Sequence, residues 1–307
     1  MRRLLTPPEG VAKAAALLAA GQPVAIPTET VYGLAAPADD ARAVAEVYRL
    51  KGRPAFNPLI VHVADLAAAE ALALFDARAR ALAAAFWPGP LTLVLPRREG
   101  AGVASLVTAG LPTVALRVPA HPLAQAVLEA LARPLAAPSA NSSGRLSPTR
   151  AGHVTLPVAV LDGGPSGAGL ESTIIGLAAA GRARLLRPGA LPAEAVEAVL
   201  GAGLAGAGEG VSAPGQLLQH YAPRQPLRLE AVERRPGEWL IGFGPVAGDS
   251  TLSASGDLAE AAARLFDELH RAETSGAERI AVAPVPGEGL GAAINDRLAR
   301  AAAGRGA

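Results

Sequence analysis

Segments with helical and with strand character alternate along the first 200 residues of this chain. The helical segments repeat apolar residues every three or four positions, whereas the strand segments are short apolar runs. This alternation predicts an α/β domain built on one twisted sheet. Helices are predicted over residues 11–20, 41–50, 121–132 and 192–200, with two Ala-rich helices between residues 64 and 86. Strands are predicted over residues 23–27, 58–63, 91–95, 113–118, 158–161, 173–177 and 184–186.

A linker separates this domain from a smaller one. Residues 201–210 read GAGLAGAGEG, a composition typical of flexible connections. Beyond it, two strand patterns (238–243 and 279–283) alternate with two helix patterns (257–275 and 290–302), which predicts a small Rossmann-like α/β domain. We therefore expect a first domain over residues 1–204, a linker over 205–225 and a C-terminal domain over 226–307.

Composition and charge exclude several classes of protein. The 307 residues have a net charge of +1, which argues against a strongly basic nucleic-acid binder but leaves room for a local basic groove. The absence of cysteine removes disulfides, thiolate zinc sites and cysteine nucleophiles. No apolar run reaches the ~18 residues of a membrane span, and Pro7-Pro8 interrupts the first segment before a signal-peptide core can form. These features predict a cytoplasmic protein.

Several familiar motifs are absent or incomplete. No Gly-Lys-Ser/Thr phosphate loop and no Gly-x-Ser-x-Gly elbow occurs, and the five histidines do not have metal-ligand spacing. The segment 242–248, GFGPVAG, follows a predicted strand, but a polar loop rather than a helix comes after it. We interpret it as a Gly-rich turn, because a dinucleotide site needs a helix N-terminus for the pyrophosphate.

Rare residue types gather in two segments. The chain contains only two lysines and three asparagines, yet Lys51 and Asn57 lie six residues apart. Lys51 falls in the last turn of a predicted helix that Gly52 would end, with Arg53 just beyond. These positions fit two interpretations: basic residues that complement the helix dipole with Asn57 as a turn residue, or a site for an anion.

The loop over residues 137–149, APSANSSGRLSPT, favours the second interpretation. It follows a strand and places hydroxyls, the amide of Asn141 and a glycine in one loop. Such a loop can donate to phosphate oxygens or hold a hydrated magnesium ion, although it could also be an ordinary polar turn. Together with Lys51 and Arg53 it would form an anion-binding cleft.

With these residues in place, the chain resembles the threonylcarbamoyl-AMP synthase family, in its longer, two-domain branch. The resemblance extends over almost the whole chain, and the shared motifs occur in family order. They are PTETVYG (27–33), KGR (51–53), WPGP (87–90), ALRVP (115–119), SAN (139–141), EST (171–173), LRPG (186–189) and HYAP (220–223).

The resemblance implies a fold, a reaction and partners. The family fold is an open twisted α/β sheet with a deep positive cleft. The family enzymes are nucleotidyltransferases that convert L-threonine, bicarbonate and ATP into L-threonylcarbamoyladenylate and pyrophosphate. Mg²⁺ is expected with the ATP phosphates rather than on a protein ligand set. The product is expected to serve partner proteins that make threonylcarbamoyladenosine in tRNA, with direct tRNA contact left open.

The resemblance also implies roles for individual residues. Catalysis is expected to rest on positioning and electrostatic stabilisation, without a covalent nucleophile. The residues expected at the reacting phosphates are Lys51, Arg53, Ser139 and Asn141. Those expected to bind threonine are Thr30, His62, Arg117, Ala137 and Ser172. Those expected to bind ATP are Arg53, Asn57, Thr113, Ser139, Ser147, Arg187 and Tyr221.

Alternatives to this reading remain at this stage. One is a non-catalytic RNA-binding module that uses a basic cleft, although only 3% of the residues are aromatic. Others are a carbamoyl-transferring enzyme, which would usually need a further domain, and a small-molecule sensor without turnover. The segment 214–224 is expected either to close over the cleft as a lid or to dock the two domains through Leu217, Leu218 and Tyr221.

Overall fold

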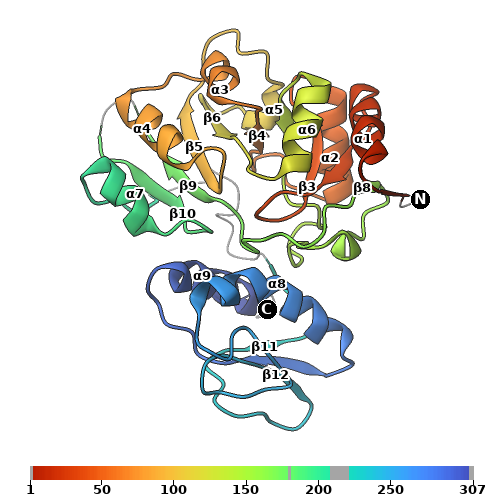
Figure 1. Ribbon diagram of the computed structural model, residues 1–307, viewed down its shortest axis with the longest axis vertical. Coiled ribbons are helices and arrows are strands. Elements are labelled where there is room, and N and C mark those ends of the chain that lie inside the picture. Colours follow the sequence, from red (N-terminus) through yellow and green to blue (C-terminus); the bar gives the residue numbers. More distant parts are fainter. Residues whose placement is uncertain (1–2, 179–180, 208–220, 304–307) are drawn as a thin grey trace.

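A computed structural model describes residues 3–178, 181–207 and 221–303 of this chain. Two sheets of unequal size are present, each with its own helices (Figure 1). This confirms the predicted α/β class and the presence of a second, smaller α/β part.

The large sheet has ten strands in the order β1-β8-β2-β3-β7-β4-β6-β5-β9-β10. Parallel and antiparallel pairs are mixed in it: β4 and β6 run parallel, for example, whereas β2 and β3 run antiparallel. The strands are β1 (Arg3–Leu5), β2 (Val24–Ile26), β3 (Gly33–Pro37), β4 (Ile60–His62), β5 (Leu91–Pro96), β6 (Thr113–Arg117), β7 (Leu135–Ala136), β8 (Ala159–Leu161), β9 (Thr173–Gly176) and β10 (Arg184–Arg187).

Helices pack on this sheet and bury its apolar side chains. They are α1 (Glu9–Ala19), α2 (Ala41–Lys51), α3 (Leu66–Leu72), α4 (Ala77–Phe86), α5 (Ser105–Thr108), α6 (Pro122–Leu131) and α7 (Ala193–Leu200), with a 3₁₀ turn at Ala151–His153. The main core includes Val44, Val47, Leu82, Leu93 and Leu116, all fully buried. Each predicted helix and strand of the first domain is confirmed to within about two residues, a usual disagreement at element ends.

Three elements of this domain escaped prediction, β1, β3 and α5, and β7 was expected before the 137–149 loop without bounds. The β3 sequence is GLAAP, whose Gly, Ala and Pro residues are all uncommon in strands. It is nevertheless buried along its whole length, paired with β2 and β7 and covered by α2. Tertiary burial therefore overrides the weak local preference, and the small side chains let α2 pack close to the sheet.

The end of α2 is built as its sequence indicates. Asp40 caps the N-terminus, where its Oδ1 accepts hydrogen bonds from the backbone N–H groups of Arg42 and Ala43. Gly52 adopts a left-handed conformation with φ of 62° and ends the helix. Lys51 and Arg53 are thereby placed on either side of a sharp change in chain direction.

The C-terminal part is a four-stranded parallel sheet with two helices. The strand order is β11-β14-β12-β13, and Figure 1 shows both helices on the side that faces the large sheet. Its elements are β11 (Leu227–Arg228), β12 (Glu238–Gly242), β13 (Ser250–Thr251), α8 (Leu258–Thr274), β14 (Arg279–Val282) and α9 (Leu290–Ala303). The GFGPVAG segment leads from β12 into a turn and then into β13, so no helix follows it.

The two parts share an apolar interface. Val31, Leu146 and Leu170 of the first part are buried in the same cluster as Leu265 and Phe266 of α8. Three arginine–carboxylate ion pairs of the described residues also cross the interface: Arg145 with Glu273, Arg150 with Asp267, and Arg297 with Glu171.

The predicted linker over residues 205–225 is described only at its two ends. Ala205 pairs with Arg184 beside β10, and Ala222 pairs with Arg145. Leu217, Leu218 and His220 lie outside the described residues, so the proposed lid stays a prediction for most of its length.

Candidate active site

A cavity of about 560 Å³, including the part open to solvent, lies where several strands of the large sheet end. Its wall is formed by the turn between β2 and β3, by the ends of β4, β6 and β10, and by the segments after β7 and before β9. The predicted site residues that line it are Thr30, Arg53, His62, Arg117, Ala137, Ser139, Ser172, Arg187 and Tyr221.

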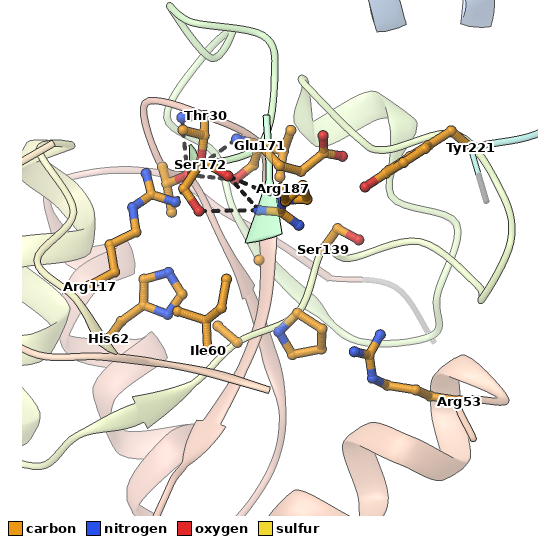
Figure 2. A pocket seen from close by; sticks show the side chains of 15 residues that line it. Thr30, Arg53, Ile60, His62, Arg117, Ser139, Glu171, Ser172, Arg187 and Tyr221 are labelled. Carbon is orange, nitrogen blue, oxygen red and sulfur yellow. Dashed lines mark hydrogen bonds between the residues drawn. The ribbon is translucent and has the colours of Figure 1, made fainter. Parts of the chain in front are cut away.

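The predicted groups lie on different sides of this cavity. Figure 2 shows Arg117 and His62 on one side, and Arg53 and Tyr221 on the other. The first pair had been expected at threonine and the second at ATP. These two pairs are therefore apart but face one space, whereas Ser172 and Arg187, one from each expected set, contact each other (Figure 2).

Arg117, at the end of β6, is held by three partners. Its Nε donates to the carbonyl of Gly89 (3.1 Å), its Nη1 to Oγ1 of Thr30 (2.8 Å) and its Nη2 to Oε1 of Glu29 (2.6 Å). We had expected a guanidinium fork open to a substrate carboxylate. In this structure Thr30 and Glu29 engage the fork, so a carboxylate ligand must share its donors or displace Glu29.

The turn that carries Thr30 is fixed by its own hydroxyls. Oγ1 of Thr28 lies 2.8 Å from Oγ1 of Thr30 and donates to the carbonyl of Val31 (2.7 Å). Such side-chain to backbone bonds hold a short segment without regular secondary structure. The PTETVYG motif is therefore a rigid turn that presents Thr30 to the cavity.

His62 is neutral and has an unused ring nitrogen. It is 4% exposed, and burial, together with the charge of Arg117, lowers its pKa to about 3. Its Nδ1 has no hydrogen-bond partner among the described residues. A buried polar atom without a partner is costly, so its position at a cavity indicates a ligand contact.

Ser172, just before β9, and Arg187, at the end of β10, are joined by hydrogen bonds. Arg187 donates to the carbonyl of Ser172 through Nη2 (2.8 Å) and also lies 3.2 Å from its Oγ. Oγ of Ser172 lies 2.7 Å from Oγ1 of Thr92 in β5.

Gly189 of the LRPG motif makes this crossing possible. A Cβ at this position would lie 2.4 Å from the carbonyl oxygen of Glu171 and 2.5 Å from backbone atoms of Ser172 and Thr173. Real Cβ atoms do not approach backbone so closely, so only glycine fits here without a shift of the cavity wall.

Lys51 does not line the cavity; it lies behind the loop that does. Its Nζ donates to the carbonyl oxygens of Ser139 (2.5 Å) and Asn141. Burial, and the nearby charge of Arg53, hold the pKa of Lys51 well below its ordinary value. In this structure, therefore, Lys51 ties the SAN loop to the end of α2, and its catalytic role stays a prediction.

Arg53 and Asn57 form one unit at the rim. Arg53 donates through Nη2 to Oδ1 of Asn57 (2.6 Å) and to the carbonyl of Pro58 (2.8 Å). Burial lowers the pKa of Arg53 to about 10, so the group remains a cation at neutral pH. Asn57 is buried and does not line the cavity, which makes it a support for Arg53 in this structure.

Three further predicted residues lie away from the cavity surface. Ser147 donates to Oε1 of Glu171 (2.5 Å), and Asn141 faces a separate groove between the two parts. Thr113 begins the strand that Arg117 ends, about 13 Å away at a strand rise of ~3.3 Å per residue. Their expected contacts with ATP are not visible in this geometry and stay predictions.

Sequence reasoning assigned no role to the two acidic residues beside the cavity, Glu29 and Glu171. Both belong to motifs that carry the family resemblance, PTETVYG and EST. An acidic residue inside each of these motifs is the signal that could have identified them. Glu29 pairs with Arg117, whereas Glu171 pairs with Arg297 of α9 (2.7 Å). Burial alone would raise the pKa of Glu171, but Arg297 and Arg187 outweigh it and lower that pKa.

No ready-made metal site occurs in residues 3–178, 181–207 or 221–303. In these ranges no group of three histidine, aspartate or glutamate side chains converges. Glu29 and Glu171, the two carboxylates at the cavity, both have arginine partners.

Comparisons with known proteins agree with this geometry. A family model described as "Telomere recombination" (Sua5, YciO and YrdC) matches residues 16–189, and one described as "Threonylcarbamoyl-AMP synthase, C-terminal domain" matches residues 191–303. The threonylcarbamoyl-AMP synthase of Bacillus subtilis is 41% identical over 325 aligned positions, which cover 96% of this chain and 93% of that protein. The one from Pyrococcus abyssi is 40% identical over 94% of this chain and 92% of that protein.

A solved structure shows the same architecture. The crystal structure of P. abyssi Sua5 complexed with L-threonine superposes with a TM-score of 0.89 at 37% identity, covering 99% of this chain and 98% of that one. Fold and cavity thus define a two-domain α/β protein with one cavity lined by three arginines, Arg53, Arg117 and Arg187. The chain belongs to the threonylcarbamoyl-AMP synthase family, in the branch that carries both the Sua5 domain and its C-terminal domain. No helix in the described ranges is long and apolar enough to cross a membrane.

Proposed function

We propose that this chain synthesises L-threonylcarbamoyladenylate from L-threonine, bicarbonate and ATP, releasing pyrophosphate. The observation that carries the proposal is one cavity in which three arginines, Arg53, Arg117 and Arg187, meet the neutral ring of His62. Three cations suit a carboxylate and a triphosphate, and the family relationship supports the identity of both. P. abyssi Sua5, which shares this fold, has been crystallised with L-threonine.

On the threonine side, three groups of the amino acid have a candidate partner: the carboxylate, one further polar group and the γ-methyl. The carboxylate would take donors from Arg117 and Thr30, at the cost of the bond to Glu29. Nδ1 of His62 is available for a second polar group. Val31 and Ile60 supply apolar wall beside these groups, and we assign the γ-methyl to this wall.

The chemical step needs no covalent enzyme intermediate. The threonine nitrogen bonds to the carbon of bicarbonate with loss of water, and the resulting carbamate oxygen attacks the α-phosphorus as pyrophosphate leaves. Arg53 and Arg187 would stabilise the charge that moves onto the leaving phosphates, with Ser139 and Tyr221 positioning the nucleotide. A bound polyphosphate would also return the pKa of Lys51 towards its ordinary value, because anions favour the ammonium form.

Magnesium would enter with ATP and would neutralise part of the negative charge of the ATP phosphates. The product is a mixed anhydride that water can hydrolyse, so it should be used soon after release. We expect a transferase in the cytoplasm to use it for tRNA modification.

Mass spectrometry of the products tests the reaction. Purified protein with MgATP, L-threonine and ¹³C-bicarbonate should yield a labelled threonylcarbamoyl-adenylate, and pyrophosphate should appear only when all three substrates are present. Serine should be the poorer substrate, because one methyl in a fitted pocket is worth about 1–3 kcal/mol. Labelled product from serine at the same rate would contradict the assigned methyl wall, and absence of any labelled adenylate would contradict the proposed reaction.

The RNA-binding alternative predicts a different outcome. A groove that stacks bases uses several aromatic side chains, whereas His62 and Tyr221 are the only aromatic rings among the described residues that line the cavity.

A further inference from the structure

Arg297, in α9 of the C-terminal domain, is one of the most deeply buried charged groups among the described residues. Its side chain is 1% exposed, although arginine is rarely buried without a specific partner. Its Nε pairs with Oε2 of Glu171 at 2.7 Å, and its Nη2 donates to the carbonyl of Pro188 at 2.9 Å. Glu171 lines the cavity, and Pro188 directly follows the cavity residue Arg187.

These bonds clamp two segments that build the cavity wall. One segment enters β9 with Glu171 and Ser172, and the other leaves β10 with Arg187 and Pro188. The guanidinium also lies under the ring of Tyr221, with 4.9 Å from its Cζ to the ring centroid. A single side chain from the C-terminal domain thus contacts three separate pieces of the cavity wall.

The charge of Arg297 has a consequence for an anionic ligand. Glu171 is ionised, since its pKa is lowered despite burial, and the other charged residues that line the cavity are the arginines Arg53, Arg117 and Arg187. Without a partner its carboxylate would repel a triphosphate, and its Oε1 would keep only the bond from Ser147. Arg297, whose Nη1 also pairs with Asp296 (2.5 Å), offsets that charge together with Arg187. Arg297 does so from behind the wall, because it does not line the cavity itself.

We propose that Arg297 is a positioning residue for nucleotide binding, through which the C-terminal domain completes the active site. It acts by neutralising Glu171, holding Arg187 through Pro188 and supporting the ring of Tyr221. This inference rests on the proposed function for the identity of the nucleotide. It assigns the C-terminal domain a direct part in the reaction rather than a tethering role.

The test compares Arg297→Gln with a matched control in the same domain, Arg228→Gln. Arg228 pairs with Glu238 (2.6 Å) inside the small sheet and has no contact with the cavity. Steady-state kinetics of pyrophosphate release and thermal melting would be measured on the full chain for both. We expect Arg297→Gln to raise KM for ATP about 5- to 30-fold, the range expected of groups that act through others, and Arg228→Gln to leave KM unchanged.

Two further variants separate charge from packing. Arg297→Lys keeps the positive charge and should raise KM less than Arg297→Gln, and it serves as the test if the glutamine variant does not fold. Glu171→Gln introduced into Arg297→Gln removes the unneutralised carboxylate and should recover part of the lost ATP affinity. If Arg297→Gln or Arg297→Lys melts lower but keeps the wild-type KM, the residue is structural only and the inference is wrong.

Failure of the proposed reaction would be visible separately. If the wild-type chain releases no pyrophosphate, equilibrium titration with MgATP replaces kinetics as the readout. Weaker ATP binding by Arg297→Gln than by Arg228→Gln would then still support the role of Arg297, and equal binding would refute it.

Discussion

Replacing Lys51 with methionine tests whether the SAN loop depends on the end of α2. Methionine has nearly the same length and volume but cannot donate to the carbonyls of Ser139 and Asn141, which both accept from Lys51 Nζ. Each carbonyl left without a partner in a buried place costs about 1–3 kcal/mol. The gain from no longer burying an amine, evident in its lowered pKa, offsets part of this.

The net loss should therefore be about 2–3 kcal/mol of unfolding free energy. For a domain of this size that corresponds to a fall in Tm of roughly 5–10 °C. If Lys51 also acts at the reacting phosphates, as predicted from the sequence, kcat for pyrophosphate release should fall by about 100-fold or more, the usual effect of removing one preorganised electrostatic donor. As a tether of the SAN loop alone, its loss should lower kcat by about 2- to 30-fold. Differential scanning calorimetry and a coupled pyrophosphate assay measure the two effects.

The other lysine of the chain supplies the matched control. Lys13 is half exposed and pairs with Glu9 on the surface of α1. Exposed pairs contribute about 0–1 kcal/mol, so Lys13→Met should change neither Tm nor kcat noticeably. A Lys51→Met protein with the Tm and kcat of Lys13→Met would refute the assigned role of Lys51.

Three further predictions concern other parts of the site. Gly189→Ala should raise the KM for both threonine and ATP, because the added methyl must displace the Glu171 backbone at the cavity wall. Unchanged KM values would show that the wall adapts. Tyr221→Phe should retain most ATP affinity, whereas Tyr221→Ala should lose it by calorimetric titration, since the ring packs on Phe266 and Arg297; equal loss in both would point to the hydroxyl instead. Acid should destabilise the fold through His153, whose pKa is lowered to about 4 by burial and by its stacked neighbour His270. Between pH 6.5 and 4 the unfolded chain therefore binds more protons than the folded chain, so the free energy of unfolding falls as the pH drops through that window. His153→Phe should reduce the difference in unfolding free energy between pH 7 and pH 5, measured by urea titration at each pH. An unchanged difference would assign the effect to other groups such as His62.

Local structure was largely predictable because its signals are local. Asp40 and Gly52 mark both ends of α2 by the backbone bonds and conformation that their side chains favour. Strands such as β5 and β6 are short, mostly apolar runs and were found within about a residue of their true ends. The strand β3 was missed, since its small residues become a strand only when β2 and β7 pair with it.

The candidate site was predictable as a set of motifs but not as a geometry. Motif residues as far apart as Thr30 and Arg187 do line one cavity. Their order in the sequence, however, could not show that Arg117 is already engaged by Glu29, or that Lys51 lies behind the loop rather than in the cavity. Thr113 shares a strand with Arg117 but lies at its opposite end.

By itself, the sequence determined the helices, most strands and the chemical types gathered at the site, because propensity, capping and apolar periodicity act over a few residues. Only the tertiary structure decided which charges meet. Glu171 and Arg297 are 126 positions apart, and nothing near either residue in the chain indicates the other. They pair because the strand order of the large sheet and the docking of α9 bring one buried carboxylate and one buried guanidinium together, where each removes the cost of burying the other.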